Sequence, residues 1–554
     1  MNFGFIAGLL TLLVSPLHRE APPLQPLQVN EKGWVIAGAG APGLAGTQTP
    51  VRLAGINVDG YIFEDGRIPP PWFITDKDFA DLAQWGANSF RLNMDYRWFL
   101  SRDLQQVNPK GWEYVDWVVA EAERHRLYVI LDMHIPVGGM QVGGNVTKLW
   151  QDANLQRVFI ELWQQVAGRY QNSPAIAGYY LIGEPTPRKA AEWQKLAQDT
   201  LEAIRQVTPD QVVIVESPNG NADGLGYIKP LKGTNVMYAW QFYEPFAFTH
   251  QGASWEEPGA LRAENVMYQG NIIEEFKTRG TDEIEAAEAY PVWTQLISAP
   301  LTAPAKATYL TLRLKAAAGE GPVSFDDLQV LENGRPMELL NPDFEEGKLV
   351  NERRDKLPDY WHASGARKSI RWEKTDSHSG KRCITFLGSK KPAALAQAAG
   401  SETGLYPVKK DAVYMVSVWV KGDRQATQEG TGLEIRWASA QGQYWGPEQL
   451  EETIVDNVVK WSQANRVPVY VPEFAASAAA PNRSDLMWTR DTLAIFDKYG
   501  LSWHLWDWRD VRGEEENINH IMGLYDGPEG ADSGRCALDK KLLEVLQAGW
   551  RKSR

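Results

Sequence analysis

Apolar and polar positions follow two alternating patterns along most of the chain. Short apolar runs are separated by longer stretches in which apolar residues recur every three or four positions. The first pattern is typical of strands buried on both faces of a parallel sheet, and the second of amphipathic helices. We expect strands at residues 51–57, 87–92, 127–133, 176–182, 211–216, 235–242, 466–471 and 501–506.

Helical patterns fill the intervals between these strands. Thr75 is a suitable N-cap for the first helix, and Leu155, Phe159, Leu162 and Val166 mark the apolar face of another. This alternation predicts an α/β fold, the (β/α)8 TIM barrel. Helices are expected near residues 76–86, 115–123, 155–170, 190–207, 450–462, 485–498 and 538–550.

The alternation stops between the sixth and seventh strands. The interruption is far longer than an ordinary loop, and residues 309–314 and 414–420 within it alternate with the period of two that strands show. We therefore expect an inserted all-β sandwich. The predicted organisation is a leader at 1–27, barrel at 28–271, insert at 272–447 and the rest of the barrel at 448–554.

The N-terminus resembles a secretory signal. Phe3 to Val14 form a short apolar stretch, and a Pro-rich segment follows it. The stretch is too short to span a bilayer, and the basic residues that usually precede such a stretch are absent. We expect a secreted or periplasmic protein, with a disordered leader on an intracellular protein as the alternative.

Charge and composition narrow the classes of partner. The formal net charge of −13, without a long basic run, opposes nucleic acid or membrane as the main partner. The 23 tryptophans favour a carbohydrate, because indole rings stack on flat, weakly polar sugar rings. No metal or cofactor motif is present, and Cys383 and Cys536 fall in different predicted domains, which opposes a disulfide. We expect a monomer.

Polar and aromatic residues at the strand ends form the candidate site, because functional groups of such barrels gather at the C-terminal ends of strands. Each has an ordinary structural explanation alone, such as core packing. Glu216 also ends a strand, but beside Ser217 and Pro218 we expect it to shape the mouth. The candidates are Asn57, Arg91, His134, Glu184, Gln241, Tyr243, Glu473, Trp506 and, for stacking, Trp508.

Glu184 and Glu473 end the fourth and seventh strands and should face each other across the mouth. Glycoside hydrolysis needs such a pair, one acid to protonate the leaving oxygen and one carboxylate to attack or to activate water. A separation of about 5–5.5 Å gives retention, and about 6.5–9.5 Å gives inversion. Arg91 would keep Glu473 ionised, and repulsion from Glu473 would help keep Glu184 protonated.

These residues resemble glycoside hydrolase family 5, the cellulase-like retaining β-glycosidases. The resemblance covers nearly all of the barrel. It implies that Glu184 is the acid/base and Glu473 the nucleophile, that Arg91 and Tyr243 hold Glu473, that His134 binds sugar hydroxyls and that Trp506 is a stacking floor. The motifs are RLNM at 91–94, LDMH at 131–134, Gly138-Gly139, Glu184-Pro185, Tyr243-Glu244-Pro245, FTHQG at 248–252, Glu473-Phe474 and the segment 503–506.

Two residues depart from that family pattern. Gly183 stands where the family has Asn, whose amide binds the 2-hydroxyl of the reacting sugar, and Gln241 stands where it has His. Gln241 can exchange hydrogen bonds but cannot become a cation. Three explanations stay open: a substrate different at C2 for which Gly183 gives room, a contact restored by Gln241 or the insert, or a weakened or inactive relative.

The insert resembles a jelly-roll carbohydrate-binding module. Asn341-Pro342-Asp343-Phe344-Glu345, Trp361, His378-Ser379-Gly380 and the strand at 414–421 match its first half. Residues 323–328 match its last strand but come earlier, which predicts circular permutation. Sugar binding and a purely structural or cleft-shaping role both stay open, because a fold does not establish binding.

The sequence therefore predicts a retaining glycoside hydrolase that cleaves β-glycosidic bonds of a β-glucan or related oligosaccharide without a cofactor. The alternative is a carbohydrate-binding protein with a weakened or inactive site. A hydrolase of other bonds on the same barrel lacks a supporting Gly-x-Ser-x-Gly nucleophile.

Overall fold

The computed structural model describes residues 24–30, 32–33, 35–37, 49–58, 65–141, 148–251, 266–319, 321–347, 357–358, 360–366, 369–374, 376–397, 405–423, 430–509, 522–526 and 537–553. Most of the expected leader lies outside these ranges, as does Cys536, so export stays a prediction. Cys383 is buried and carries a free thiol. Within the described ranges we find no helix with the length and apolar character that a membrane span needs.

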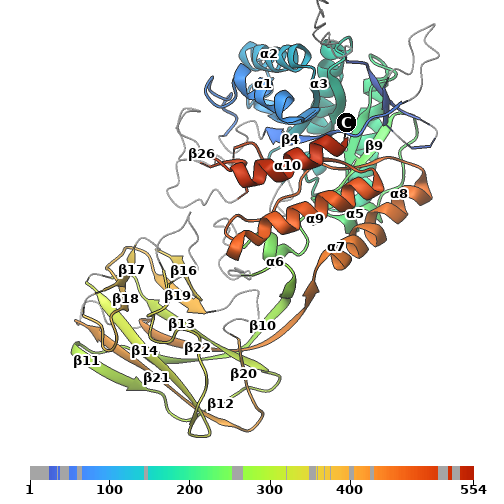
Figure 1. Cartoon of the computed structure of the whole chain (residues 1–554). Helices are drawn as coiled ribbons and strands as arrows, with labels where there is room; N and C mark the ends of the chain where they lie inside the picture. The colour runs from blue at the N-terminus through green and yellow to red at the C-terminus, as the bar shows by residue number, and fades with distance from the viewer. Residues whose placement is uncertain are drawn as a thin grey trace, which may run out of the picture.

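Eight parallel strands close into a barrel, which confirms the expected architecture (Figure 1). Each strand is buried along its whole length, as expected of a sheet covered on both faces. Neighbouring strands pair in parallel register, with Asn57 opposite Arg91. In chain order the strands are β4 (Ala54–Val58), β5 (Ser89–Asp95), β6 (Tyr128–Ile135), β7 (Ile176–Tyr180), β8 (Val213–Glu216), β9 (Val236–Ala239), β23 (Val469–Val471) and β24 (Ser502–Leu505).

Helices cover the outside of the barrel and bury one apolar face against it. The side chain of Asp152 caps one of them by accepting the N–H of Asn154, and another ends at Gly86, whose positive φ of 113° suits glycine. The helices are α1 (Asp76–Trp85), α2 (Pro109–His125), α3 (Ala153–Tyr170), α4 (Ala190–Arg205), α5 (Ala222–Leu225), α6 (Phe246–Thr249), α7 (Pro447–Ile454), α8 (Lys460–Asn465), α9 (Ser484–Tyr499) and α10 (Lys540–Ser553), with short turns η1 (Tyr96–Trp98), η3 (Lys148–Trp150), η4 (Pro218–Gly220), η6 (Val455–Val459) and η7 (Pro481–Arg483).

The N-terminal end of the barrel is covered by a small antiparallel sheet. Leu27 and Val35 pack into one apolar cluster with Ile130 and Ile214 of the barrel, and the hydroxyl of Tyr128 donates to the carbonyl of Gln25 at 2.9 Å. The C-terminal ends of the strands form the opposite mouth. The small sheet consists of β1 (Leu27–Val29), β2 (Val35–Ala37) and β3 (Thr49–Pro50), and a separate pair consists of β25 (Tyr525–Asp526) and β26 (Ala537–Leu538).

Two antiparallel sheets lie between β9 and β23, the sixth and seventh barrel strands. Side chains from both sheets, among them Leu312, Phe325, Val416 and Trp437, form a second core. One sheet contains β10 (Gly270–Glu285), β13 (Tyr309–Ala316), β16 (Trp361–Gly365), β19 (Ala393–Gln397), β20 (Tyr406–Pro407) and β22 (Gly432–Trp445), and the other contains β11 (Tyr290–Ile297), β12 (Leu301–Thr302), β14 (Val323–Glu332), β15 (Arg335–Pro336), β17 (Ile370–Glu373), β18 (Cys383–Phe386) and β21 (Val413–Gly422).

Strands β10 and β22 connect this all-β region to the barrel. They pair from Gly270 opposite Trp445, beside the barrel, to Glu285 opposite Gly432. Figure 1 shows the two long strands running side by side from the barrel into the sheets. The inserted region therefore leaves and rejoins the barrel through one antiparallel ribbon.

Candidate active site

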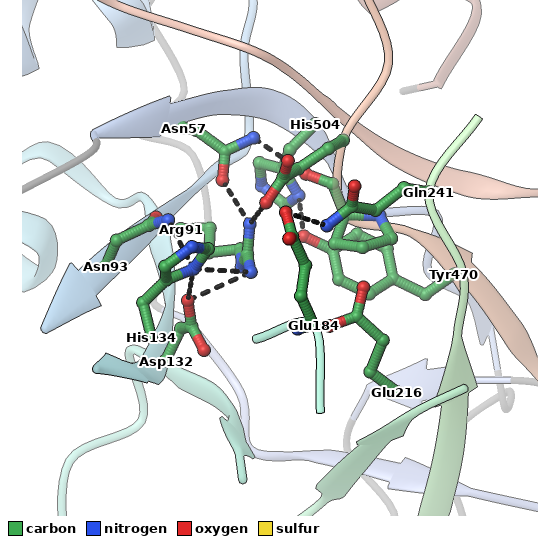
Figure 2. Close-up of polar contacts among 12 residues, drawn as sticks. Asn57, Arg91, Asn93, Asp132, His134, Glu184, Glu216, Gln241, Tyr470 and His504 are labelled. Atoms are coloured by element: carbon green, nitrogen blue, oxygen red, sulfur yellow. Dashed lines mark hydrogen bonds and ion pairs between the residues drawn. The ribbon is translucent and has the colours of Figure 1, made fainter. Parts of the chain in front are cut away.

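The structure brings the two candidate carboxylates together at the barrel mouth. Glu184 follows β7, and Glu473 follows β23. One carboxylate oxygen of each, together with one ring nitrogen of His134, lie within 4.8 Å of one another. Figure 2 shows Arg91 and His134 on one side of Glu184 and Gln241 on the other. The separation of the two glutamates fits the closer spacing that retaining glycosidases use.

Glu473 is held on both oxygens. Arg91 Nη1 donates to Oε1 at 2.7 Å, and the hydroxyl of Tyr243 donates to Oε2 at 3.2 Å. The N–H of Phe242 also donates to the carbonyl of Glu473 at 2.9 Å, which ties its backbone to the end of β9. The Glu473 carboxyl thus faces a guanidinium that stays charged at all working pH values. This arrangement holds the carboxyl in a fixed orientation.

Arg91 is itself fixed by residues on β4 and β6, the two strands that flank β5. It is fully buried, and its Nη2 pairs with Asp132 Oδ2 at 2.9 Å. Asn57 Oδ1 accepts from Arg91 Nη1 at 2.9 Å. The Asn57 amide nitrogen donates to the carbonyls of Pro472 and Leu505, at 2.7 and 3.1 Å. Because Asn57 is fully buried and its amide is engaged within the protein, we reassign it from substrate contact to a residue that positions Arg91.

Glu184 meets the requirements of a general acid. Burial raises the pKa of its carboxyl, and the charge of Glu473 raises it further. Gln241 Nε2 donates to Glu184 Oε1 at 3.0 Å, and this hydrogen bond acts in the opposite direction by favouring the ionised form. The net direction is upward, so Glu184 keeps its proton to a higher pH than an ordinary glutamate. Gln241 therefore reaches the site, as the sequence analysis suggested it could.

His134 is oriented by a carboxylate beneath it. Its Nδ1 lies 2.9 Å from Asp132 Oδ2 and 3.1 Å from Asn93 Nδ2. Burial acts to lower the pKa of His134, but the charge and hydrogen bond of Asp132 outweigh burial, so the pKa is raised. The ring lies 6.1 Å from that of Trp506. His134 is thereby locked in place at the edge of the carboxylate pair.

Gly183 leaves no empty space beside the site. A Cβ atom added to Gly183 would lie 2.5 Å from His134 Nδ1 and 2.9 Å from Cε1. Real Cβ contacts do not come this close, and Asp132 prevents the ring from moving freely. The imidazole of His134 thus occupies the volume in which a side chain at residue 183 would begin. The proposal that Gly183 makes room for an unusual sugar does not fit this geometry.

We expect Gly183→Asn to lose activity and stability rather than to restore a missing contact. Overpacking of this kind typically costs about 1–3 kcal/mol, and displacement of His134 would disturb both glutamates. Thermal unfolding and kcat/KM on an aryl β-glucoside measure the two effects. Gly168→Ala in α3 is the matched control, since its new Cβ meets only Val207 at 4.0 Å and should be neutral or stabilising. A more active Gly183→Asn enzyme would contradict the expectation.

The two candidate tryptophans lie in different places. Trp506 packs with Ile135 and Tyr243 beside the carboxylate pair, and only 4% of its surface is exposed. Trp508 lies outside this group, with its ring 5.9 Å from that of Trp85 in α1. We therefore withdraw Trp508 as a substrate contact. Both tryptophans follow β24, which ends at Leu505, so the alternation of strand faces does not determine where either side chain points.

Several buried polar residues of the site were not singled out from the sequence. Asn93 and Asp132 stand two residues from Arg91 and His134, respectively, on strands β5 and β6. Since alternate residues of a strand share a face, that spacing was the available signal. Tyr470 and His504 form a further pair inside the barrel, with the hydroxyl 2.5 Å from Nδ1. Burial lowers the pKa of His504 well below its ordinary value, which leaves the ring neutral.

An eight-stranded parallel barrel with two facing carboxylates at its mouth defines the protein as a glycoside hydrolase of the retaining type. Residues 44–298 match the cellulase family, glycosyl hydrolase family 5. Endoglucanase C of Acetivibrio thermocellus is 30% identical over 230 residues, which cover 40% of this chain and 67% of that protein. Cellodextrinase A of Ruminococcus flavefaciens is 26% identical over 245 residues, which cover 43% of this chain and 72% of that protein.

The chain thus belongs to glycosyl hydrolase family 5. A solved structure of a glycoside hydrolase aligns over 90% of this chain and 99% of that one, with a TM-score of 0.49 and 17% identity. Beta-xylosidase of Phanerodontia chrysosporium is 27% identical over 228 residues, which cover 39% of this chain and 48% of that protein.

Proposed function

We propose that the protein cleaves β-glucans or related β-linked oligosaccharides by double displacement. The observation that carries the proposal is the pair of carboxylates within 4.8 Å, one beside Arg91 and one with a raised pKa. Glu473 attacks the anomeric carbon while protonated Glu184 delivers its proton to the leaving oxygen. The covalent glycosyl-enzyme then reacts with water, from which Glu184 removes a proton.

The substrate class follows from the relatives. Those compared with this chain include endoglucanases and a cellodextrinase, names that refer to β-glucan chains and their fragments. The neighbouring beta-xylosidase widens the class to other β-linked sugars. We therefore place a β-glucan first and a β-linked pentose substrate second. His134 and Trp506, which lie beside the glutamates, are the residues proposed to bind and stack on the sugar.

The departures at residues 183 and 241 favour a rearranged site over a degraded one. His134 fills the volume beside Gly183, and Gln241 donates to Glu184. The nucleophile, its two donors and the acid remain in reach of one another. We propose that Gln241 and His134 together take over the polar contacts that the missing asparagine makes in relatives.

The inserted region is proposed to be a jelly-roll domain of the carbohydrate-binding-module type, spanning about residues 272–447. Its two antiparallel sheets around one apolar core support this. His378 stacks on Trp419 with ring centres 3.6 Å apart, so this indole shares its face with a protein ring. Sugar binding by the insert, export and the monomeric state stay predictions.

Product stereochemistry tests the proposed reaction. We expect the wild-type enzyme to release the β-anomer first from a soluble β-glucan or cellooligosaccharide, because two successive inversions restore the original configuration. Proton NMR recorded before mutarotation distinguishes the anomers. Initial release of the α-anomer would show that water attacks the substrate directly, without a covalent intermediate. Absence of any sugar release at high enzyme concentration, with measurable glycan binding, would favour the carbohydrate-binding alternative.

A further inference from the structure

A third carboxyl group lies directly behind the acid/base residue. Glu216 is the last residue of β8 and is fully buried. Its Oε2 accepts the backbone N–H of Glu184, as the two residues placed side by side in Figure 2 suggest. The carbonyl of Glu216 accepts from the indole of Trp193 at 2.8 Å, which fixes the start of the same loop. Glu216 therefore contacts the backbone of Glu184 at the mouth, where the sequence predicted it.

The backbone that Glu216 contacts is in an unusual conformation. Glu184 has a φ of +50°, in the left-handed region that residues other than glycine seldom adopt. Such conformations persist only where the surroundings hold them in place. The N–H of Asn219 donates to the carbonyl of Pro185 at 2.8 Å, on the other side of Glu184. Residues at and just after the end of β8 thus bind the backbone before and after the Cα atom of Glu184.

The charges around Glu216 favour a neutral acid. Arg91 already faces two carboxylates, Asp132 and Glu473, so an ionised Glu216 would add a further negative charge to a buried site whose guanidinium is already paired twice. Burial raises the pKa of Glu216 well above its ordinary value, and the charges of Glu473 and Glu184 raise it further against the effect of Arg91. Its Oε1 accepts no hydrogen bond within the described residues, so no donor there stabilises a negative charge on that atom.

We propose that Glu216 acts as an uncharged carboxylic acid that positions Glu184 for proton transfer. Glu216 Oε2 accepts the N–H of Glu184 and so helps to hold the unfavourable backbone conformation of that residue. An ionised Glu216 would place a second negative charge beside Glu184, and that charge would compete with Glu473 in setting the pKa of the acid. A neutral Glu216 avoids this. This inference rests on the proposed function and assigns Glu216 a positioning role, not a catalytic one.

Glu216→Leu and Glu216→Gln test the proposal. The Leu variant removes the acceptor, and a misplaced acid should cost on the order of 10²-fold in kcat/KM on substrates with poor leaving groups. The same variant should lose little kcat/KM on dinitrophenyl β-glycosides, because their leaving groups depart without a proton. The Gln variant keeps a neutral acceptor and should recover most of the lost activity. Equal losses on both substrate types, or no recovery in Glu216→Gln, would overturn the positioning role.

The pH profile tests the charge of Glu216. If the group is neutral, the basic limb of kcat/KM in Glu216→Gln should coincide with that of the wild type. If it is ionised, its removal would lower the pKa of Glu184 and move that limb to lower pH, which would overturn the neutral assignment. Gln211→Leu is the structural control. Gln211 also links β8 to β7, through Nε2 to the carbonyl of Ile176 at 2.6 Å, but at the other end of the barrel.

A readout without turnover separates this inference from the proposed function. In a Glu184→Gln background, adding Glu216→Gln should remove one protonated-carboxyl band from the infrared spectrum at neutral pH. The difference between the two spectra cancels the other buried acids, such as Asp326, whose pKa is raised to about 7. The band decides the protonation state even if the Leu variant does not fold or the wild type releases no sugar. A missing band would overturn the neutral assignment, whereas inactivity of the wild type alone would count only against the proposed function.

Discussion

Glu473→Gly should abolish turnover, and azide should restore it with inverted stereochemistry. The carboxylate is the only group held by both Arg91 and Tyr243 in the described part of the site. Loss of a covalent nucleophile costs on the order of 10⁶-fold in other hydrolases. Azide is small enough to occupy the space that the deleted side chain leaves. With a dinitrophenyl β-glycoside as substrate, attack from that side gives an α-glycosyl azide, which NMR identifies.

Glu473→Gln provides the matched control for folding. The amide oxygen still accepts from Arg91, so the buried guanidinium keeps a partner and the stability should stay close to that of the wild type. The Gln variant should be as inactive as Glu473→Gly, and azide should not restore it because no space opens. A β-configured azide product from Glu473→Gly, or full activity of Glu473→Gln, would show that another residue is the nucleophile.

The barrel could be predicted because its signal is local. Runs such as 176–182 have no charged residue, and a strand covered on both faces buries all of its side chains. The same logic located Glu184 and Glu473, since each follows such a run and a parallel barrel brings all strand ends to one mouth. Arg91 was found in this way although it is 382 residues from Glu473, its partner.

Contacts that depend on backbone direction could not be predicted in this way. The sequence shows that Glu216 ends a strand, but not that its carboxyl meets the N–H of Glu184, because the left-handed backbone of Glu184 and the direction of its N–H are not determined by residue type. From the sequence alone, the glycine at residue 183 likewise suggests an open space. The structure shows that His134 fills that space. In both cases the contact joins residues from two neighbouring strands, so the sequence of either strand alone does not reveal it.

Glu184→Gln should separate substrates by their leaving groups. General acid catalysis contributes about 10²–10⁴-fold, so kcat/KM on β-glucan or phenyl β-glycosides should fall by about this factor. Dinitrophenyl β-glycosides should still form the glycosyl-enzyme, since their leaving groups need no proton. The second step then lacks its base, so a burst followed by slow turnover is expected. Azide, which needs no base, should accelerate that turnover and give a β-glycosyl azide, the opposite configuration to the Glu473→Gly product.

The same variant should change the pH profile. In the wild type, kcat/KM needs protonated Glu184, whose pKa is raised by burial and by the charge of Glu473. Activity should therefore persist above the range of an ordinary glutamate and fall as pH rises through that raised pKa. In Glu184→Gln the basic limb should vanish for activated substrates. Glu244→Gln, which alters a neighbouring carboxyl that accepts the N–H of Tyr243 at 3.1 Å, should retain it. Equal losses on both substrate types in Glu184→Gln would assign the proton transfer to another group.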